Sequence, residues 1–287
     1  MMLAIIDGGS TKADWQIRKD GFVPFNLTTT GFNPNYDSKE KIQHLLSTEI
    51  IGSLTKNEPI EIHYYGAGCW DPSRKAIVRN AFETVFPNAE IFIDHDLLAA
   101  ARATCGDQPG IACILGTGSN SVLYDGKEEI DNVTNLGFLL GDEGSGSMIG
   151  KRLVQAYFYR EMPEELHYIM KKECPNGKLD ILDKIYEGGV PAAYLATFTK
   201  KFNEHRTHPF IWNTIKDCFS EFLRRHVFKY ENYRSLPIHF VGSVAFHFKD
   251  ILEELMNEYG LQLGVVLPRP IEALFDYHLQ KETKPNI

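Results

Sequence analysis

Residues 2–21 read MLAIIDGGSTKADWQIRKDG, an apolar run that ends in an acidic residue, two glycines, two hydroxyls and a lysine. The run 3–6 is short, apolar and closed by glycine, as expected of a buried central strand. After the turn at 7–12 comes a second strand and then Asp20-Gly21, which predicts a type I′ hairpin, with Pro24 predicting an edge position or a bulge. Alone, DGGSTK is typical of a tight turn, since glycine takes positive φ at no steric cost.

The same order of features returns about 110 residues later, in GIACILGTGSNSVLYDG at 110–126. Both turns pass from strand to strand, whereas dinucleotide-binding and Walker loops pass from strand into helix. The nearby SGSMIGKR does not fit a P-loop, because Ser145 and Arg152 replace its first glycine and its final Ser or Thr. Two such turns, facing one another across a cleft, would offer backbone N–H groups and hydroxyls to a triphosphate. The pair therefore predicts phosphate binding.

The remaining apolar spacing alternates between helical and strand periods. It predicts strands over 60–68, 89–96, 237–246 and 263–268, and helices over 39–55, 74–85, 97–104, 147–161, 211–230, 249–260 and 271–281. This alternation is typical of an α/β protein. The repeat divides the chain into lobes 1–104 and 105–269, the second with a helical insertion, and the helix 270–282 is expected to complete the first lobe.

Composition narrows the class of partner. A chain of 287 residues with 43% hydrophobic and 24% charged residues is expected to be globular, and a net charge of -8 argues against nucleic acid and favours a small substrate. No apolar stretch reaches the roughly 18 to 20 residues of a membrane helix. The five cysteines are widely spaced without a C-x-x-C pair, so we expect reduced thiols in the cytoplasm. The aromatic residues of 157–248 are compatible with a homodimer but do not specify one.

Acidic residues follow two of the predicted strands. Phosphoryl transfer needs a metal ion on the phosphate oxygens and a carboxylate to accept the proton of the acceptor hydroxyl. Asp7, at the end of the first strand, suits Mg²⁺. Asp94 and Asp96 end another strand and begin a helix, so each is a candidate for the base, and helix capping is expected of one of them. His95, a histidine without spaced partners, is expected to be structural.

Three further motifs have a structural and a functional interpretation. In GDEGSGS at 141–147, Asp142 and Glu143 either favour the positive end of the next helix or bind substrate hydroxyls. VGSVAF at 241–246 is either a strand-to-helix turn or a place where backbone approaches a flat nucleobase. Lys12 either neutralises a phosphate or is simply solvated.

With these motifs in order, the sequence resembles the BadF/BadG/BcrA/BcrD-type ATPase family of the actin, hexokinase and heat-shock chaperone superfamily, and within it the N-acetylglucosamine kinases. DGGSTK matches the first phosphate motif, GTGSNS the second and VGSVAF the adenosine motif, while GDEGSGSMIG is the most specific match. The resemblance covers essentially the whole chain. It implies two ribonuclease-H-like lobes, actin-like ATPase in fold, that close over ATP, Mg²⁺ and a sugar.

Carried over residue by residue, the resemblance makes Asp96 the catalytic base toward a sugar 6-hydroxyl, with Asp94 as the alternative, and lets Asp7 hold Mg²⁺ through water. Asn120, Asp142 and either Asn33 or Asn35 would bind the sugar. The expected nucleotide ligands are turn residues: Gly8, Gly9, Ser10, Thr11, Lys12, Gly116, Thr117 and Gly118 at the phosphates, and Gly242 and Ser243 near the adenine.

The sequence also departs from the family. Leu136 stands where animal N-acetylglucosamine kinases have a sugar-binding tryptophan, and Glu272 stands where relatives commonly have glycine. Two other functions therefore stay open: a family ATPase that activates a dehydratase through a shared iron–sulfur cluster, and a non-catalytic sugar or nucleotide sensor. The first needs cysteine thiolates in a defined setting, and these cysteines lie apart.

Overall fold

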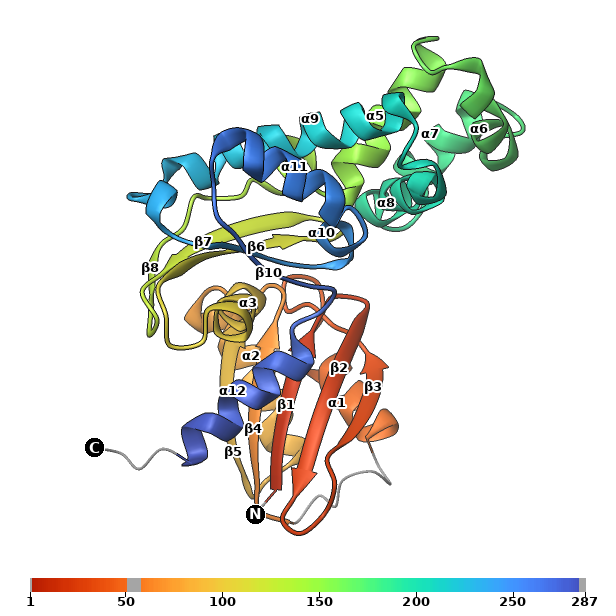
Figure 1. The fold of residues 1–287 in the computed structure, drawn as a ribbon. Coiled ribbons are helices and arrows are strands. Elements are labelled where there is room, and N and C mark those ends of the chain that lie inside the picture. The colour runs from red at the N-terminus through yellow and green to blue at the C-terminus, as the bar shows by residue number, and fades with distance from the viewer. Residues whose placement is uncertain (1, 51–57, 284–287) are drawn as a thin grey trace. The chain divides into compact units, whose positions relative to one another are not determined.

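The structure, a computed structural model, describes residues 2–50 and 58–283. The chain forms two compact units (Figure 1), one of Met1–Gly106 with Pro270–Ile287 and one of Asp107–Arg269. Within the described residues no helix is long and apolar enough to cross a membrane.

A five-stranded sheet forms the centre of the first unit, in the order β3-β2-β1-β4-β5. Its strands are β1 Met2–Gly8, β2 Lys12–Lys19, β3 Phe25–Thr30, β4 Ile60–Gly66 and β5 Ala89–His95. β2 runs antiparallel to β1 and β3, whereas β1, β4 and β5 are parallel, with Gly8 opposite Gly66 and Gly66 opposite His95. The carboxyl ends of β1 and β5, where Asp7 and Asp96 lie, therefore share one edge of the sheet.

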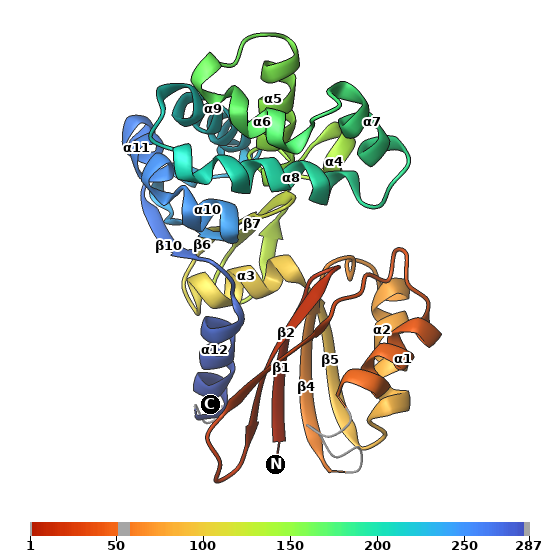
Figure 2. The ribbon, with the colours of Figure 1, turned by 90° about the vertical axis from the view of Figure 1, so that its right-hand side faces the viewer.

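Helices cover both faces of this sheet, as Figure 2 shows: α1 Lys39–Glu49 and α2 Pro72–Val85 on one, α3 Asp96–Cys105 and α12 Ile271–Thr283 on the other. Alternate residues of β1 account for this, because successive side chains of a strand point to opposite faces. Ala4 and Ile6 belong to the core with α1 and α2, and Leu3 and Ile5 to the core with α3 and α12. The end of the chain thus completes the first unit.

The second unit repeats this topology in the order β10-β9-β6-β7-β8. Its strands are β6 Gly110–Leu115, β7 Ser119–Tyr124, β8 Glu129–Asp131, β9 Ile238–Val241 and β10 Leu263–Leu267. As in the first sheet, the first strand pairs antiparallel with the strand after the glycine turn and parallel with a later strand. The internal repeat and the α/β fold class expected from the sequence are confirmed.

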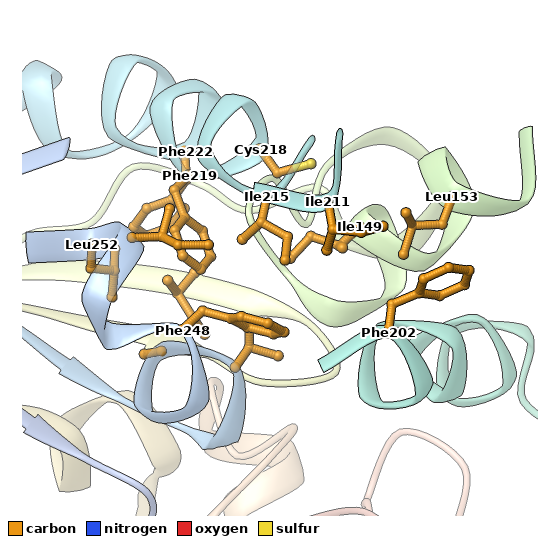
Figure 3. Close-up of a cluster of buried hydrophobic side chains, with 14 of the residues drawn as sticks. Ile149, Leu153, Phe202, Ile211, Ile215, Cys218, Phe219, Phe222, Phe248 and Leu252 are labelled. Carbon is orange, nitrogen blue, oxygen red and sulfur yellow. The ribbon is translucent and has the colours of Figure 1, made fainter. Parts of the chain in front are cut away.

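Helices make up most of the remaining second unit. They are α4 Gly137–Leu140, α5 Gly146–Phe158, α6 His167–Glu173, α7 Lys178–Tyr186, α8 Pro191–Phe202, α9 Pro209–Arg225, α10 Ser243–His247 and α11 Lys249–Tyr259, with the 3-10 turns η1 Glu164–Leu166, η2 Asn203–His205, η3 Val227–Lys229 and η4 Tyr233–Ser235. Side chains from several of these helices share one buried cluster (Figure 3), among them Leu153 of α5, Phe202 of α8, Phe219 of α9 and Leu252 of α11.

Two local predictions were wrong. Asp20-Gly21 is not a type I′ turn, since φ is positive at Gly21 (+82°) but not at Asp20, and residues 20–24 all separate β2 from the edge strand β3. The strand expected over 237–246 ends at Val241, because Gly242 (φ +123°) turns the chain into α10.

The helix expected over 39–55 ends at Glu49, and residues 51–55 lie outside the described residues.

Candidate active site

The first glycine turn packs tightly on its own sheet. The Gly9 N–H donates to the carbonyl oxygen of Lys12 at 2.9 Å, and the Gly8 carbonyl accepts from the N–H of Ala67 at 2.9 Å. A Cβ at Gly8 would lie 2.3 Å from the hydroxyl oxygen of Tyr64. Glycine is required there by close packing and not by positive φ.

The side chains of this turn differ in their partners. Ser10, Thr11 and Lys12 are exposed, and the Ser10 hydroxyl accepts a hydrogen bond from Asn33 Nδ2 at 3.0 Å. Lys12 Nζ lies 2.8 Å from a carboxylate oxygen of Asp14. A contact of Lys12 with phosphate would therefore have to replace the ion pair with Asp14, and an exposed ion pair costs little to break.

Two carboxylates, Asp7 near the end of β1 and Asp96 at the start of α3, lie close enough to influence one another. Burial raises the pKa of Asp7 to about 7, and the negative charges of Asp96 and then Asp14 add to the rise, against a smaller opposing effect of Lys12. Mg²⁺ binds through one or two carboxylates and keeps several waters, so this donor set fits it. In residues 2–50 and 58–283 no group of three or more His, Cys, Asp or Glu side chains is arranged to hold a metal ion.

The residues around Asp96 have separate structural roles. Asp94 Oδ1 accepts from Lys75 Nζ at 2.6 Å, and Oδ2 lies 4.0 Å from Arg102. The N-cap of α3 is His95, whose Nδ1 accepts from the N–H of Leu98 at 3.4 Å. The prediction that Asp94 or Asp96 caps the helix is therefore wrong, because His95 between them is the cap. The structural role predicted for His95 is confirmed.

The two candidate asparagines of GFNPN are linked to each other. Asn33 is buried, and its Oδ1 accepts from the N–H of Asn35 at 2.9 Å. Asn35 is exposed, and its own Oδ1 accepts from Arg74 Nε. Since Asn33 also contacts Ser10, the structure brings Asn33, and not Asn35, into contact with the first glycine turn.

The first residues of α5 donate hydrogen bonds to the backbone of the second glycine turn, residues 116–118. The carbonyl oxygens of Gly116 and Thr117 accept from the N–H groups of Gly146 at 2.8 Å and Ser147 at 3.1 Å, and the Gly118 carbonyl accepts from the Gly116 N–H at 2.9 Å. All three carbonyls of the turn, which would repel a phosphate, are thus bound by the protein itself. This arrangement suits a turn that presents N–H groups to an anion.

Asp142 lies against this turn in a strained conformation. Its φ is +58°, unusual for a residue other than glycine, and its Oδ1 accepts from the Ser119 N–H at 3.1 Å and from Asn135 Nδ2 at 3.0 Å. A Cβ at Gly118 would lie 3.0 Å from that oxygen. Burial is the main cause of a raised Asp142 pKa. Backbone strain of this kind is concentrated at functional sites.

The neighbours of Asp142 are occupied by other contacts. Glu143 is buried, with His226 Nε2 at 3.1 Å and Arg225 Nε at 3.4 Å from its carboxylate, and α5 is capped by Ser145. Asn120 Oδ1 accepts from the N–H of Ser121 at 2.9 Å. Of the two acids in GDEGSGS, only Asp142 contacts the glycine turn.

A pocket of about 500 Å³ opens beside this turn, entirely within the second unit. It joins the turn to the VGSVAF motif and to α8. It is lined by Gly116, Thr117, Ala193, Ala196, Thr197, Thr199, Lys200, Asn203, Glu204, Ser243, Val244, His247 and Phe248. The residues of α8 and η2 were missed by the sequence analysis, because they carry no motif and only the fold brings them to the turn.

Two departures from the family pattern lie in different places. Leu136 is 63% exposed and lines a second pocket of about 360 Å³ with Thr134 and Gly141. Glu272, in the first turn of α12, is close enough to Asp7 to contribute to its raised pKa.

Gly242 permits the sharp turn at the pocket, which leads to a prediction. Its φ is +123°, and a Cβ there would lie 2.3 Å from the carbonyl oxygen of Leu115. We expect Gly242→Ala to lower the free energy of unfolding by about 2 to 4 kcal/mol. Gly260→Ala is the matched control, because φ is +62° but the site is open, so only about 1 to 2 kcal/mol is expected. Denaturant unfolding measures both, and equal losses would contradict the close contact with Leu115.

Comparisons with known proteins agree on one kind of relative. No family model matches the sequence. A solved structure from Porphyromonas gingivalis, of a protein proposed to be an N-acetylglucosamine kinase, is 36% identical, with a TM-score of 0.89 over 99% of this chain and 100% of that one. An N-acetylmuramic acid/N-acetylglucosamine kinase of Clostridium acetobutylicum is 25% identical over 211 residues, 69% of this chain and 68% of the relative. A Schistosoma mansoni hexokinase shares the fold, at 8% identity and a TM-score of 0.53 over 98% of this chain and 85% of that one.

Proposed function

The chain belongs to the N-acetylglucosamine kinase-like sugar kinases of the actin and hexokinase superfamily, and on that premise we propose that it transfers the γ-phosphate of ATP to the 6-hydroxyl of an amino sugar. N-acetylglucosamine is the first choice of acceptor. The observation that carries the proposal is the 500 Å³ pocket that joins the second phosphate turn to the adenosine motif.

The second unit would hold the nucleotide. Thr117 and Gly118 would offer backbone N–H groups to the phosphates, while Gly116, whose N–H is bonded to the Gly118 carbonyl, would lie beside them. Gly242 and Ser243 would lie near the base. Because the turn is held in place before ATP arrives, little reorganisation is needed when charge develops during transfer.

The first unit would supply the carboxylates. Asp96 would accept the proton of the sugar hydroxyl, and Asp7 would hold Mg²⁺ through water, supported by the negative charges of Asp96 and Asp14 close to it. Bound Mg²⁺ neutralises charge on the phosphate oxygens. Ser10, with Thr11, Gly8, Gly9 and Lys12, would add contacts from the first turn.

The sugar would be bound by carboxylate and amide side chains. Asp142, oriented by Ser119 and Asn135, would accept from sugar hydroxyls, and Asn33 is preferred over Asn35 because it is buried beside Ser10. Asn120 would add a further contact. We place the reaction in the cytoplasm, where ATP and Mg²⁺ are abundant.

A sugar panel tests this function. Purified protein with ATP and Mg²⁺ is offered glucose, glucosamine, N-acetylglucosamine, N-acetylmannosamine and N-acetylmuramic acid, with ADP release and product mass as readouts. We expect N-acetylglucosamine to give the highest kcat/KM and a phosphate on O6. Absence of turnover with every sugar would overturn the proposal. Sugar binding without turnover would then favour a sensor, and an iron-containing coloured preparation would favour a dehydratase activator.

A further inference from the structure

We infer that Trp70 is an aromatic platform for the sugar, so that the acceptor is a closed pyranose ring that packs one C–H face on the exposed indole. The inference rests on the proposed function, because it assumes that a sugar hydroxyl is brought to Asp96. It goes beyond that function because it adds an apolar contact to a set of carboxylates and amides.

Trp70 differs from the other two tryptophans of the chain in its exposure. It is 44% exposed, whereas Trp15 is 1% exposed and Trp212 is partly buried. The indole N–H groups of Trp15 and Trp212 donate to Thr29 at 2.9 Å and to Glu254 at 3.4 Å. Trp70 has no hydrogen-bond partner among the residues that the structure describes. Of the three, Trp70 is therefore the one that presents its ring to a ligand.

One face of the Trp70 ring is covered by His95. The two ring centroids are 3.9 Å apart and the planes are inclined by 17°, so the rings are stacked. His95 is buried and is held as the N-cap of α3, where its Nδ1 accepts from the N–H of Leu98. The exposed surface of Trp70 is therefore the opposite face and the edge of a ring whose plane is already fixed.

The segment that carries Trp70 follows β4 and is anchored on both sides. The Ala67 N–H donates to the Gly8 carbonyl oxygen at 2.9 Å, and Cys69 is fully buried. Directly after Trp70, Asp71 is the N-cap of α2. A side chain that is ordered before a ligand arrives loses little conformational entropy on binding.

The same segment lies against the candidate sugar-binding and catalytic residues of the first unit. Gly68 has a φ of +84°, and a Cβ there would lie 2.3 Å from Oδ1 of Asn33. Burial raises the pKa of Cys69 to about 12, and the negative charge of Asp96 is the next cause of the rise. Trp70, the residue after Cys69, also stacks on the residue before Asp96. A sugar bound by Asn33 with a hydroxyl at Asp96 would therefore lie beside the indole.

A pyranose suits this surface chemically. The face of an aromatic ring is negative in its charge distribution. The C–H groups of a pyranose carry a slight positive charge and gather on its two faces, whereas equatorial hydroxyls point outward from its rim. A sugar that lies on Trp70 keeps its rim hydroxyls available to Asn33 and Asp96, so the apolar and polar contacts do not compete.

Steady-state kinetics test the platform. With ATP saturating and N-acetylglucosamine varied, Trp70→Ala should raise the sugar KM by about 10- to 100-fold, because the apolar burial of a large side chain is lost. Because such a contact is made equally in the ground state and the transition state, kcat should stay within about 3-fold. Trp70→Phe keeps an aromatic face, so its sugar KM should rise by no more than about 5-fold.

Tryptophan fluorescence gives a readout that needs no turnover. When N-acetylglucosamine is titrated without ATP, the emission of the wild-type protein should shift, because Trp70 passes from solvent into contact with the sugar. Trp70→Phe should lose this shift, while calorimetry still detects sugar binding. Trp212→Phe is the matched control, since Trp212 lies on α9 of the second unit and bonds to Glu254, and it should keep the shift. Thermal melts confirm that each variant is folded.

The outcomes separate the platform from the proposed function. An unchanged sugar KM in Trp70→Ala, or a fluorescence shift that survives in Trp70→Phe, would overturn the platform and leave the kinase intact. A lower kcat with an unchanged sugar KM would also overturn it, because Trp70 would then act on Asp96 through His95. A shift that depends on Trp70, in a wild-type protein that phosphorylates no sugar, would overturn the kinase and keep the platform. Absence of sugar binding to the wild-type protein would overturn both.

Discussion

Asp96→Asn is expected to lower kcat by about 100- to 10 000-fold, the usual contribution of a general base, with little change in the KM for ATP. The amide has nearly the size of the carboxylate but cannot accept the proton of the sugar hydroxyl. The KM should hold because the pocket assigned to ATP is built from the second unit, whereas Asp96 belongs to the first. Initial rates with saturating sugar, over a range of ATP concentrations, measure both constants.

Asp94→Asn is the matched control for this prediction. Asp94 is two residues away and forms the ion pair with Lys75, so its loss should cost at most about 1 kcal/mol of stability and leave kcat within about 3-fold. An active Asp96→Asn together with an inactive Asp94→Asn would move the base to Asp94.

Asp7→Asn is expected to act in opposite directions on activity and on stability. Removal of the carboxylate should raise the Mg²⁺ concentration needed for half-maximal rate by at least about 10-fold, because one or two carboxylates are all that such sites provide. In the metal-free protein, however, the same change should raise the free energy of unfolding by about 2 to 4 kcal/mol at pH 8.

The pH dependence follows from the raised pKa of Asp7, about 7 in the folded protein against about 3.8 ordinarily. Between these values the folded state holds a proton that the unfolded chain has released, so this group's contribution to stability falls as pH rises from 4 to 7. Below pH 4 both states are protonated, and the difference between wild type and Asp7→Asn should vanish. Urea unfolding of both proteins at pH 4, 6 and 8, in the presence of a metal chelator, measures this difference in the free energy of unfolding.

Asp14→Asn is the control for the stability effect. Asp14 also raises the pKa of Asp7, but less than burial and Asp96 do, and it pairs with Lys12. We expect Asp14→Asn to raise the free energy of unfolding at pH 8 by less than Asp7→Asn does. A metal-free Asp7→Asn protein no more stable than wild type at pH 8 would contradict the desolvated, charge-crowded setting of Asp7.

Local sequence was sufficient for the strand–turn–strand unit that begins each sheet. An apolar strand, a Gly/Ser/Thr turn and a returning strand are contiguous in the chain, so their pairing depends on neighbours that are close in sequence. The repeat of that order at 2–21 and 110–126 therefore predicted the shared topology of β1-β2 and β6-β7.

The sequence did not predict correctly which residue caps α3 or where β9 ends. His95 caps α3 where an aspartate was expected, and Gly242 ends β9 before the predicted strand is complete. Asp and His can both accept from a helix N–H, and His95 is the cap because α3 begins at Asp96, the residue after it.

The sequence by itself determined the α/β class, the repeated strand–turn–strand units and the identity of the acidic candidates, because these depend on residue type and short-range periodicity. Only the tertiary structure decided that Asp96 rather than Asp94 lies near Asp7, that Asn33 rather than Asn35 contacts the first turn, and that α8 and Asn203 line the pocket beside the second glycine turn. These facts depend on contacts between segments far apart in the chain, and packing, not local propensity, sets such contacts.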